Sequence, residues 1–354
     1  MSDQLETPRG ERRNPTRQHP VIERLAGSSL SHPLAGLTAA WAALVIFSAM
    51  TQDRFLTEVN ITNILRSNSS LFLLAMGSTF ALVSGGVDLS VGSNLALTGI
   101  AMSQFAEAMP IGTAMILALL LATACGTANG VLIGAFGLSP FVVTLGSLAA
   151  LRGFALIWTD GRTVTFTESF IVKLGDGSWG RVPVPAVIMI GSLVVCWYLL
   201  RFTYFGRDVY AVGGNEQAAN LAGIHVDRVR IGVYAISGFF AGAAGVLLTG
   251  RLVSASPTVA QGWELTAIAA ILLGGTTLAG GVGGVAGSAI GVLFLGTINN
   301  SLTLADVSSF WQFVVTGVVL IAALGFDRLR LQFALRRVTA HDQHDNPQQG
   351  GQEE

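Results

Sequence analysis

Apolar runs close to 20 residues long recur along this chain, and few polar stretches separate them. As a helix, a run of about 20 residues crosses the roughly 30 Å hydrocarbon core of a bilayer. Ten candidate spans lie near 34–51, 64–84, 89–108, 111–134, 138–159, 183–201, 229–250, 264–281, 284–304 and 308–325. The weakest is 264–281, because Gly274-Gly275 and Thr276-Thr277 interrupt it. The pattern predicts an all-α polytopic membrane protein with about ten transmembrane helices.

The composition agrees with a helical membrane protein. Apolar residues make up 51% of the chain, charged residues make up only 12%, and 43 residues are glycine. The formal net charge is −1, so the basic footprint of a nucleic-acid-binding protein is missing. Cys125 and Cys196 lie in apolar runs without metal-ligand spacing to another Cys or His. We therefore expect buried thiols, and neither a metal site nor a cofactor.

The distribution of basic residues orients the spans. An even number of spans puts both termini on one side of the membrane. With the termini inside, thirteen basic residues face the cytoplasm and six face the outside. The positive-inside rule favours this orientation. We expect a cytoplasmic N-terminal tail over 1–33 without a cleavable signal, a transmembrane domain over 34–327, and a cytoplasmic C-terminal tail over 328–354.

The segment 201–228 is the one long polar stretch in the interior of the sequence, and this orientation places it in the cytoplasm. Within it, residues 216–222 are typical of a short amphipathic helix, with Gly223 as its left-handed stop. Glu216 is placed to favour the helix dipole or to meet a basic residue of a partner. The small-residue face consists of Ala218, Ala219, Leu221 and Ala222. Such a face is small enough to seat in a groove of a soluble partner.

The chain carries no ATPase signature. A phosphate-binding loop needs Gly-x-x-x-x-Gly-Lys-Ser/Thr, and the only lysine is Lys173, which follows Val172. The spans also lack the chained Asp, Glu and His residues of a proton relay, and all five histidines fall outside them. One carboxylate suffices for a proton-coupled symporter, so that alternative stays open. The polar segment favours a transporter that is driven by ATP hydrolysis in a bound ATPase.

Glycine spacing indicates close packing between helices. Small-residue repeats at a spacing of four occur at Gly126/Gly130/Gly134, Gly238/Gly242 and Gly287/Gly291. These repeats let helix backbones approach each other in lipid. A Gly-Gly-x-x-Leu frame also occurs twice, at 85–89 and at 274–278, each time after an apolar helix. Broken helices in repeats are common near transporter substrate sites, although chance explains such a match equally well in a glycine-rich chain.

Polar residues within or beside the spans are candidates for the solute path. They are Asp88, Asn94, Asn129, Arg152, Glu264 and Asn299. Asp88 precedes a helix, so N-capping is the alternative to a path role, and Glu264 lies in a first turn that favours a carboxylate. Arg152 must face a polar cavity or extend to the interface. For the asparagines, interhelical hydrogen bonding is the alternative. The outer loop 160–182 either docks a binding protein or caps the bundle.

Three stretches resemble the ribose-type permeases of ATP-binding-cassette (ABC) importers, within the branched-chain amino acid/ribose permease superfamily. They are SGGVDLSVGS (84–93), TYFGRDVYAVGGNEQAANLAGI (203–224) and ELTAIAAILLGGT (264–276). The similarity runs over roughly residues 40–327, in the family's order and spacing. The loop motif of other ABC permeases begins Glu-Ala-Ala, whereas here Gln217 is inserted after Glu216.

The resemblance implies a permease subunit that imports a monosaccharide or similar polyhydroxylated solute through a bacterial plasma membrane. It implies as partners a second permease, two cytoplasmic ATPase subunits and an extracytoplasmic solute-binding protein. We assign ATPase coupling to Gly206, Gly214, Asn215, Glu216, Ala218, Ala219 and Gly223. A secondary symporter is the alternative function. A passive channel would leave the cytoplasmic helix without a role.

Overall fold

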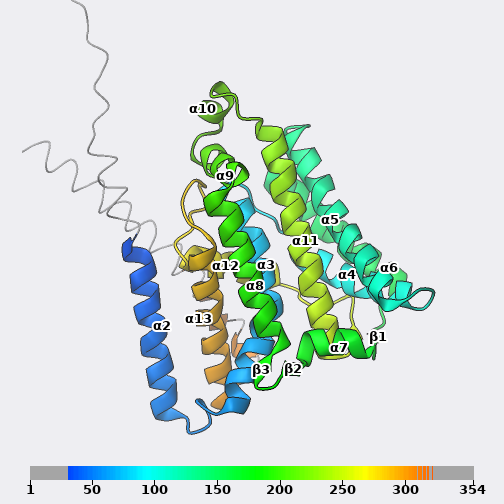
Figure 1. Cartoon of the computed structure of the whole chain (residues 1–354), viewed down its shortest axis with the longest axis vertical. Coiled ribbons are helices and arrows are strands. Elements are labelled where there is room, and N and C mark those ends of the chain that lie inside the picture. Colours follow the sequence, from blue (N-terminus) through cyan, green and yellow to red (C-terminus); the bar gives the residue numbers. More distant parts are fainter. Residues whose placement is uncertain (1–30, 309, 313, 316, 319–320, 322–354) are drawn as a thin grey trace, which may run out of the picture.

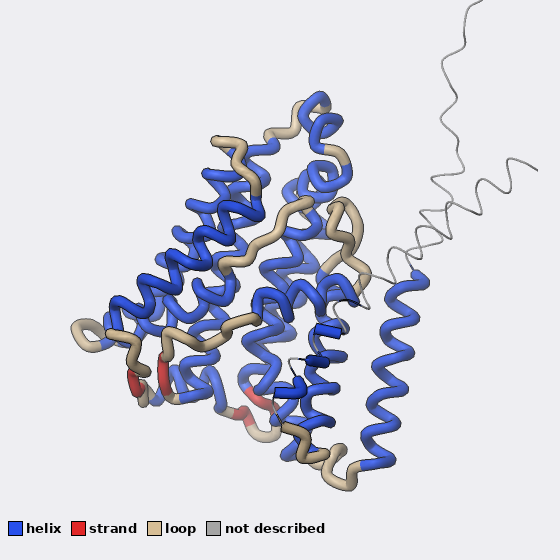
Figure 2. Tube along the Cα trace, turned by 180° about the vertical axis from the view of Figure 1, so that it is seen from behind, coloured by secondary structure: helices blue, strands red, loops and turns tan. Residues whose placement is uncertain are grey.

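The structure is a computed structural model that describes residues 31–308, 310–312, 314–315, 317–318 and 321. It is a bundle of helices (Figures 1 and 2). The helices are α2 Ser31–Thr51, α3 Glu58–Val83, α4 Val91–Ala106, α5 Ile111–Gly134, α6 Pro140–Thr159, α7 Ser169–Asp176, α8 Val184–Phe202, α9 Tyr204–Gly214, α10 Glu216–Leu221, α11 Val226–Leu252, α12 Trp263–Leu273 and α13 Val285–Leu304. Two ribbons join β1 Val164–Thr165 to β4 Ser254–Ala255, and β2 Ser178–Trp179 to β3 Val182–Pro183.

The helical class expected from the apolar runs is confirmed. Six of the described helices, α2, α5, α6, α8, α11 and α13, are long and apolar enough to cross a membrane. The expected span 308–325 lies partly outside the described residues, and the tails 1–33 and 328–354 lie largely or wholly outside them. The number of ten spans therefore stays a prediction.

The centre of the bundle is α11, which packs between α5 on one side and α3 on the other (Figure 1). The spaced glycines of α5 face it, as predicted. A Cβ on Gly126 would lie 2.9 Å from the Cα of Gly238 in α11, and a Cβ on Gly130 would lie 2.7 Å from the Cα of Ile231. The two helix backbones are therefore in direct contact, which only residues without side chains allow.

The expected helix over 264–281 is wrong in its second half, because α12 ends at Leu273. Gly275 follows with a left-handed backbone, φ +85°, and its N–H donates to the carbonyl of Leu272 at 2.9 Å. The N–H of Thr276 donates to the carbonyl of Ile271 at 3.3 Å. These two bonds form a Schellman stop, and the chain continues as a loop until α13.

The end of α3 repeats this stop. Gly85 is left-handed, φ +80°, and donates to Leu82, while Gly86 donates to Ala81. In the structure the left-handed Gly85 therefore corresponds to Gly275. The two Gly-Gly-x-x-Leu frames in the sequence pair Gly85 with Gly274, so the structural correspondence is shifted by one residue. We call the loops 84–90 and 274–284 the two helix breaks.

The bundle has two distinct ends. Helices α9 and α10 lie at the end where α2 begins, and α7 and the two β-ribbons lie at the opposite end (Figures 1 and 2). Helix α2 stands at the margin beside α13. It is held there by Trp41, whose indole N–H donates to Thr297 at 3.0 Å, and by Ser48, whose hydroxyl lies 2.7 Å from that of Ser301.

Candidate functional site

Asp88 is the most buried acidic side chain described, with 1% of its surface exposed, and it lies in the first helix break. Its Oδ1 accepts hydrogen bonds from the main-chain N–H and the hydroxyl of Ser90, at 3.0 and 2.6 Å. Its Oδ2 accepts the hydroxyl of Ser237 in α11 at 2.7 Å. No described basic side chain forms an ion pair with Asp88.

The N-cap interpretation of Asp88 is wrong. Helix α4 begins at Val91, so Ser90 occupies the N-cap position and Asp88 stands two residues before it. An N-cap side chain bonds the N–H groups of the first helical turn, but the Asp88 carboxylate is turned towards Ser90 and Ser237. Its hydrogen bonds therefore tie the first helix break to α11.

Asn129 extends this arrangement into two further helices. Its Nδ2 donates to the Ser90 hydroxyl at 3.0 Å, and its Oδ1 accepts the hydroxyl of Ser147 in α6. We call Asp88, Ser90, Asn129, Ser147 and Ser237 the Asp88 network. It joins the first helix break, α5, α6 and α11 through polar groups alone.

Asn94 lies on α4 beyond the network. Its Nδ2 donates to the carbonyl of Ala122 in α5 at 3.0 Å, so Asn94, like Asn129, makes the expected interhelical bond. The Oδ1 of Asn94 and the hydroxyl of Ser93 are buried without a described hydrogen-bond partner. Helix α4 therefore carries buried polar groups that are free to bind a further hydrogen-bonding partner.

The sequence predicted that Arg152 faces a polar cavity or extends to the interface, and the structure places it half-buried on α6 against main-chain carbonyl groups. Its guanidinium donates to the carbonyls of Pro257 and Val259, at 2.5 and 2.9 Å, in the loop between α11 and α12. Glu264 lies in the first turn of α12, and its Oε1 accepts the main-chain N–H of Gly262 at 3.2 Å. Its Oε2 is buried without a described partner. Arg152 and Glu264 thus border one loop without forming an ion pair.

Asn299 is not brought into the Asp88 network. It lies half-buried on α13, and no described group hydrogen-bonds its side chain. Its neighbour Asn300 exchanges two amide hydrogen bonds with Asn60 of α3, at 2.8 and 3.0 Å. The polar face of α13 therefore serves helix packing through Asn300.

The polar segment 201–228 folds into two short helices, α9 and α10, where the sequence indicated only the second. Asn215 caps α10, because its Oδ1 accepts the N–H of Ala218 at 3.0 Å. Gly223 has φ +85°, and the N–H of the residue after it donates to the carbonyl of Ala219 at 3.0 Å. The prediction that Gly223 is the left-handed stop is confirmed.

The outward face of α10 differs from the expected one. Leu221 is 91% exposed, whereas Ala219 is 4% exposed and packs into the core, so placing Ala219 on the docking face was wrong. Glu216 is paired within the chain, with its Oε2 2.6 Å from the guanidinium of Arg230 in α11. The exposed surface of α10 therefore includes Leu221 and Ala218.

The two glycines of α9 that the sequence analysis assigned to coupling, Gly206 and Gly214, have different surroundings. Gly206 accepts no side chain, because a Cβ would overlap the carbonyls of Leu199 and Leu200. Its N–H bonds the hydroxyl of Thr203, the N-cap of α9, at 3.1 Å. Gly214 has open space around it. Gly206 is thus required for the turn from α8 into α9, whereas a Cβ at Gly214 would meet no atom within 4 Å.

Tyr210 attaches α9 to the second helix break. Its hydroxyl donates to the carbonyl of Gly283 at 2.8 Å. Burial raises the pKa of this hydroxyl above its ordinary value, and the positive charge of Arg201 acts in the opposite direction. The hydroxyl therefore stays protonated and keeps donating at physiological pH.

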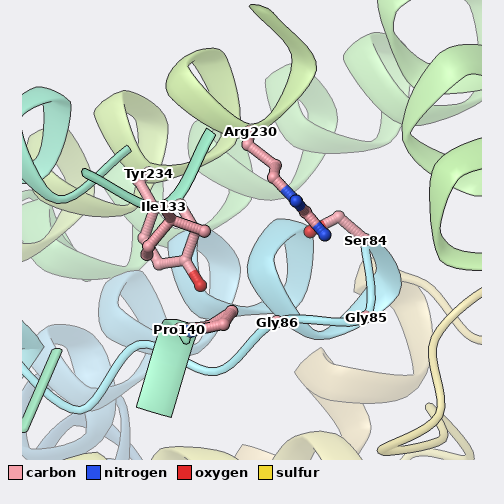
Figure 3. A pocket seen from close by; sticks show the side chains of 7 residues that line it. All are labelled: Ser84, Gly85, Gly86, Ile133, Pro140, Arg230 and Tyr234. Atoms are coloured by element: carbon pink, nitrogen blue, oxygen red, sulfur yellow. The ribbon is translucent and has the colours of Figure 1, made fainter. Parts of the chain in front are cut away.

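A small hollow lies beside the first helix break (Figure 3). Its lining residues are Ser84, Gly85, Gly86, Ile133, Pro140, Arg230 and Tyr234. The hydroxyl of Tyr234 donates to the carbonyl of Val87 at 3.2 Å, so this ring holds the break in place. Arg230 lines the hollow and also pairs with Glu216, so one side chain connects α10 to the edge of the first helix break.

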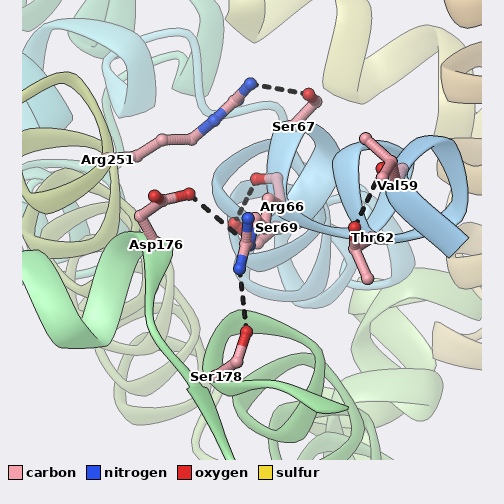
Figure 4. A network of polar contacts seen from close by, with 8 residues as sticks. All are labelled: Val59, Thr62, Arg66, Ser67, Ser69, Asp176, Ser178 and Arg251. Atoms are coloured by element: carbon pink, nitrogen blue, oxygen red, sulfur yellow. Dashed lines mark hydrogen bonds and ion pairs between the residues drawn. The ribbon is translucent and has the colours of Figure 1, made fainter. Parts of the chain in front are cut away.

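At the opposite end, a polar network ties α7 to the bundle (Figure 4). The guanidinium of Arg66 in α3 lies 3.4 Å from Asp176 and donates to Ser178 at 2.8 Å. Arg251 of α11 donates to Ser67 at 2.6 Å. The loop 160–182 is therefore packed against the end of the bundle, which agrees with the capping role, one of the two roles predicted for it.

The sequence did not indicate the serines of the Asp88 network. Ser90 stands inside the string SGGVDLSVGS, two residues after Asp88, and this spacing is the one available signal. Ser147 and Ser237 lie in apolar helices, where single hydroxyls are common and carry no pattern. Their role follows only from the packing of α6 and α11 around the first helix break.

Comparison with known proteins gives the family. Residues 60–324 match the family described as the branched-chain amino acid transport system / permease component. The chain belongs to this permease family. The chain is therefore a multi-pass membrane permease of the bacterial inner-membrane type, without ATPase activity of its own.

Several curated permeases are similar along most of their length. The ribose import permease protein of Bacillus subtilis is 42% identical over 288 residues, which cover 80% of this chain and 89% of the relative. The D-allose transport system permease protein of Escherichia coli is 39% identical over 81% of this chain and 88% of the relative. The L-arabinose transport system permease protein of the same species is 36% identical over 83% and 90%. No solved structure matches the chain.

Proposed function

We propose that this permease translocates a monosaccharide and is powered by a separate cytoplasmic ATPase. The observation that carries the proposal is the similarity to permeases named for ribose, D-allose and L-arabinose transport over about four fifths of the chain. The Asp88 network supports it, because buried hydroxyl, amide and carboxylate groups at a helix break suit a solute rich in hydroxyl groups.

The proposed path passes between the helix breaks. Asp88 and Asn129 belong to the network there, and Asn94 has a free amide oxygen beside it. Arg152 and Glu264 hold the loop over the start of α12. Asn299 is the weakest of the candidates, since it has no contact with the network.

Helix α10 is the proposed contact with the ATPase. It is a short helix with an exposed apolar residue, Leu221, at an end of the bundle. A second permease and an extracytoplasmic solute-binding protein complete the proposed importer. In such a complex ATP must favour one conformation of the permease over the other, or the solute does not move.

The function is tested by uptake into proteoliposomes that contain the permease, its ATPase and its binding protein. D-Ribose, D-allose and L-arabinose are the sugars to compare. We expect uptake of one of them to require ATP and to persist without a proton gradient. Uptake that follows the proton gradient without ATP would establish the symporter instead.

Leu221→Asp should weaken binding of the ATPase at least about tenfold, because burying a leucine side chain contributes about 1.5–3 kcal/mol to an interface. The variant should still insert, since Leu221 is 91% exposed in the chain alone. Leu221→Met is the matched control and should bind as wild type. The measurement is the affinity of the purified ATPase for permease in nanodiscs. Equal affinity for both variants would move the docking surface away from α10.

The orientation is a second prediction. Ten spans with cytoplasmic termini place Gln217 of α10 inside the cell and Asp176 of α7 outside, and these two helices lie at opposite ends of the bundle (Figure 1). A cysteine at Asp176 should react with an impermeant thiol reagent in intact cells, and a cysteine at Gln217 should react only after the cells are opened. Labelling of position 217 in intact cells would reverse the orientation.

A further inference from the structure

The last turn of α9 touches both helix breaks at one point. Gly213 in this turn lies so close to the end of α3 that a Cβ would overlap the carbonyl oxygen of Val83. The same Cβ would lie 2.7 Å from the main-chain nitrogen of Gly281 in the second helix break. That nitrogen donates a hydrogen bond to the Val83 carbonyl at 2.8 Å. Three backbone segments that are distant in sequence therefore meet at Gly213.

The neighbouring glycines continue the contact. A Cβ on Gly280 would lie 2.7 Å from the Cα of Gly85 and 2.8 Å from the carbonyl oxygen of Gly213. A Cβ on Gly281 would lie 2.7 Å from the Cα of Gly214. The hydroxyl of Tyr210 adds the hydrogen bond from α9 to Gly283. Backbone packed on backbone has no side chain that can move aside to absorb a shift.

We propose that Gly213 is a positioning residue that transmits displacement of α9 and α10 to both helix breaks together. The first break carries Asp88 and the Ser84–Gly86 wall of the hollow, so the displacement reaches the solute path directly. This inference rests on the proposed function, because it takes α9 and α10 as the segment that the ATPase moves. A packed contact of this kind changes between discrete arrangements instead of stretching.

The test measures how readily a thiol in the lining of the hollow reacts in the presence and absence of nucleotide. Ser84→Cys places a thiol in its lining, in a chain whose native cysteines, Cys125 and Cys196, are replaced by alanine. The probe is N-ethylmaleimide, and its reaction rate is compared with and without ATP and vanadate. The chain is reconstituted with its ATPase. Gly213→Ala is the variant, and Gly191→Ala on α8 is the control, because a Cβ at Gly191 meets no atom within 4 Å.

With wild-type Gly213 we expect nucleotide to change the labelling rate at least about threefold, as a shift between two conformations requires. Gly191→Ala should keep this response. Gly213→Ala should lose it while the ATPase still co-purifies and hydrolyses ATP. An equal nucleotide response in Gly213→Ala would overturn the inference, as would a complex that assembles and hydrolyses ATP but never changes the labelling rate.

Failure of the proposed function gives a different result, since the ATPase would then not co-purify with the unmodified chain. If Gly213→Ala does not reach the membrane, the inference is tested with Tyr210→Phe instead. This variant removes only the hydroxyl that bonds Gly283. We expect it to assemble normally and to reduce the nucleotide response at least about twofold, since it removes one of the attachments that bias the second break. A full response in Tyr210→Phe would overturn the inference.

Discussion

We expect Gly126→Leu to remove the permease from the membrane and Gly112→Leu, on the same helix, to leave it there. A Cβ at Gly126 would overlap the carbonyl oxygen of Tyr234 and would lie 2.9 Å from the Cα of Gly238 in α11. Overpacking costs about 1–3 kcal/mol even where side chains can move. Here the contact is with backbone, so α5 must separate from the central helix. We expect the amount of folded protein to fall at least about tenfold.

Gly112 gives the matched control, because no atom lies within 4 Å of a Cβ built there. The measurement is the amount of monodisperse protein after extraction in mild detergent, with equal expression confirmed by blotting. If both leucine variants accumulate equally, α5 and α11 do not depend on backbone contact, and the glycine spacing has another cause.

Asp88→Asn should abolish most transport and leave the fold intact. The asparagine has the same size, its oxygen can accept both hydrogen bonds from Ser90, and the Ser237 hydroxyl can turn to accept from its amide nitrogen. Hydrogen bonds to a charged group contribute about 1.5–3 kcal/mol, against about 0.5–1.5 kcal/mol for neutral pairs. A loss of about 1.4 kcal/mol at the transition state slows translocation tenfold, so uptake should fall by at least that factor.

Two controls separate charge from packing. Asp88→Leu removes all three hydrogen bonds and should also lower the amount of folded protein. Asp88→Glu keeps the charge and should transport better than Asp88→Asn. The assay is the initial rate of sugar uptake per permease in proteoliposomes. Wild-type uptake by Asp88→Asn would reduce Asp88 to a structural tie between the first helix break and α11.

The sequence predicted the parts of this permease that depend on local pattern. Spans of uniform apolar composition, such as 111–134, match the helix bounds of α5. The stop at Gly223 was also predictable, because a left-handed backbone strongly favours glycine. The break after Leu273 was only suspected, since a Gly-Gly pair inside an apolar run is compatible with a continuous helix.

The site was less predictable because it depends on which surfaces meet. The sequence placed Ala219 and Leu221 on one face, but the six-residue helix α10 turns Ala219 inward and Leu221 outward. Asp88 was recognised as a candidate, yet its partner Ser237 is 149 positions away. No local pattern relates residues at that separation.

The brevity of α12 has a consequence for biogenesis. Its 11 residues extend about 16 Å, roughly half of the hydrocarbon core, and the loop that follows exposes main-chain groups. A nascent chain that ends after α12 cannot partition into lipid as an independent span. We therefore expect α12 to insert only after α13 has emerged from the ribosome, so that the two helices enter the membrane as a single unit.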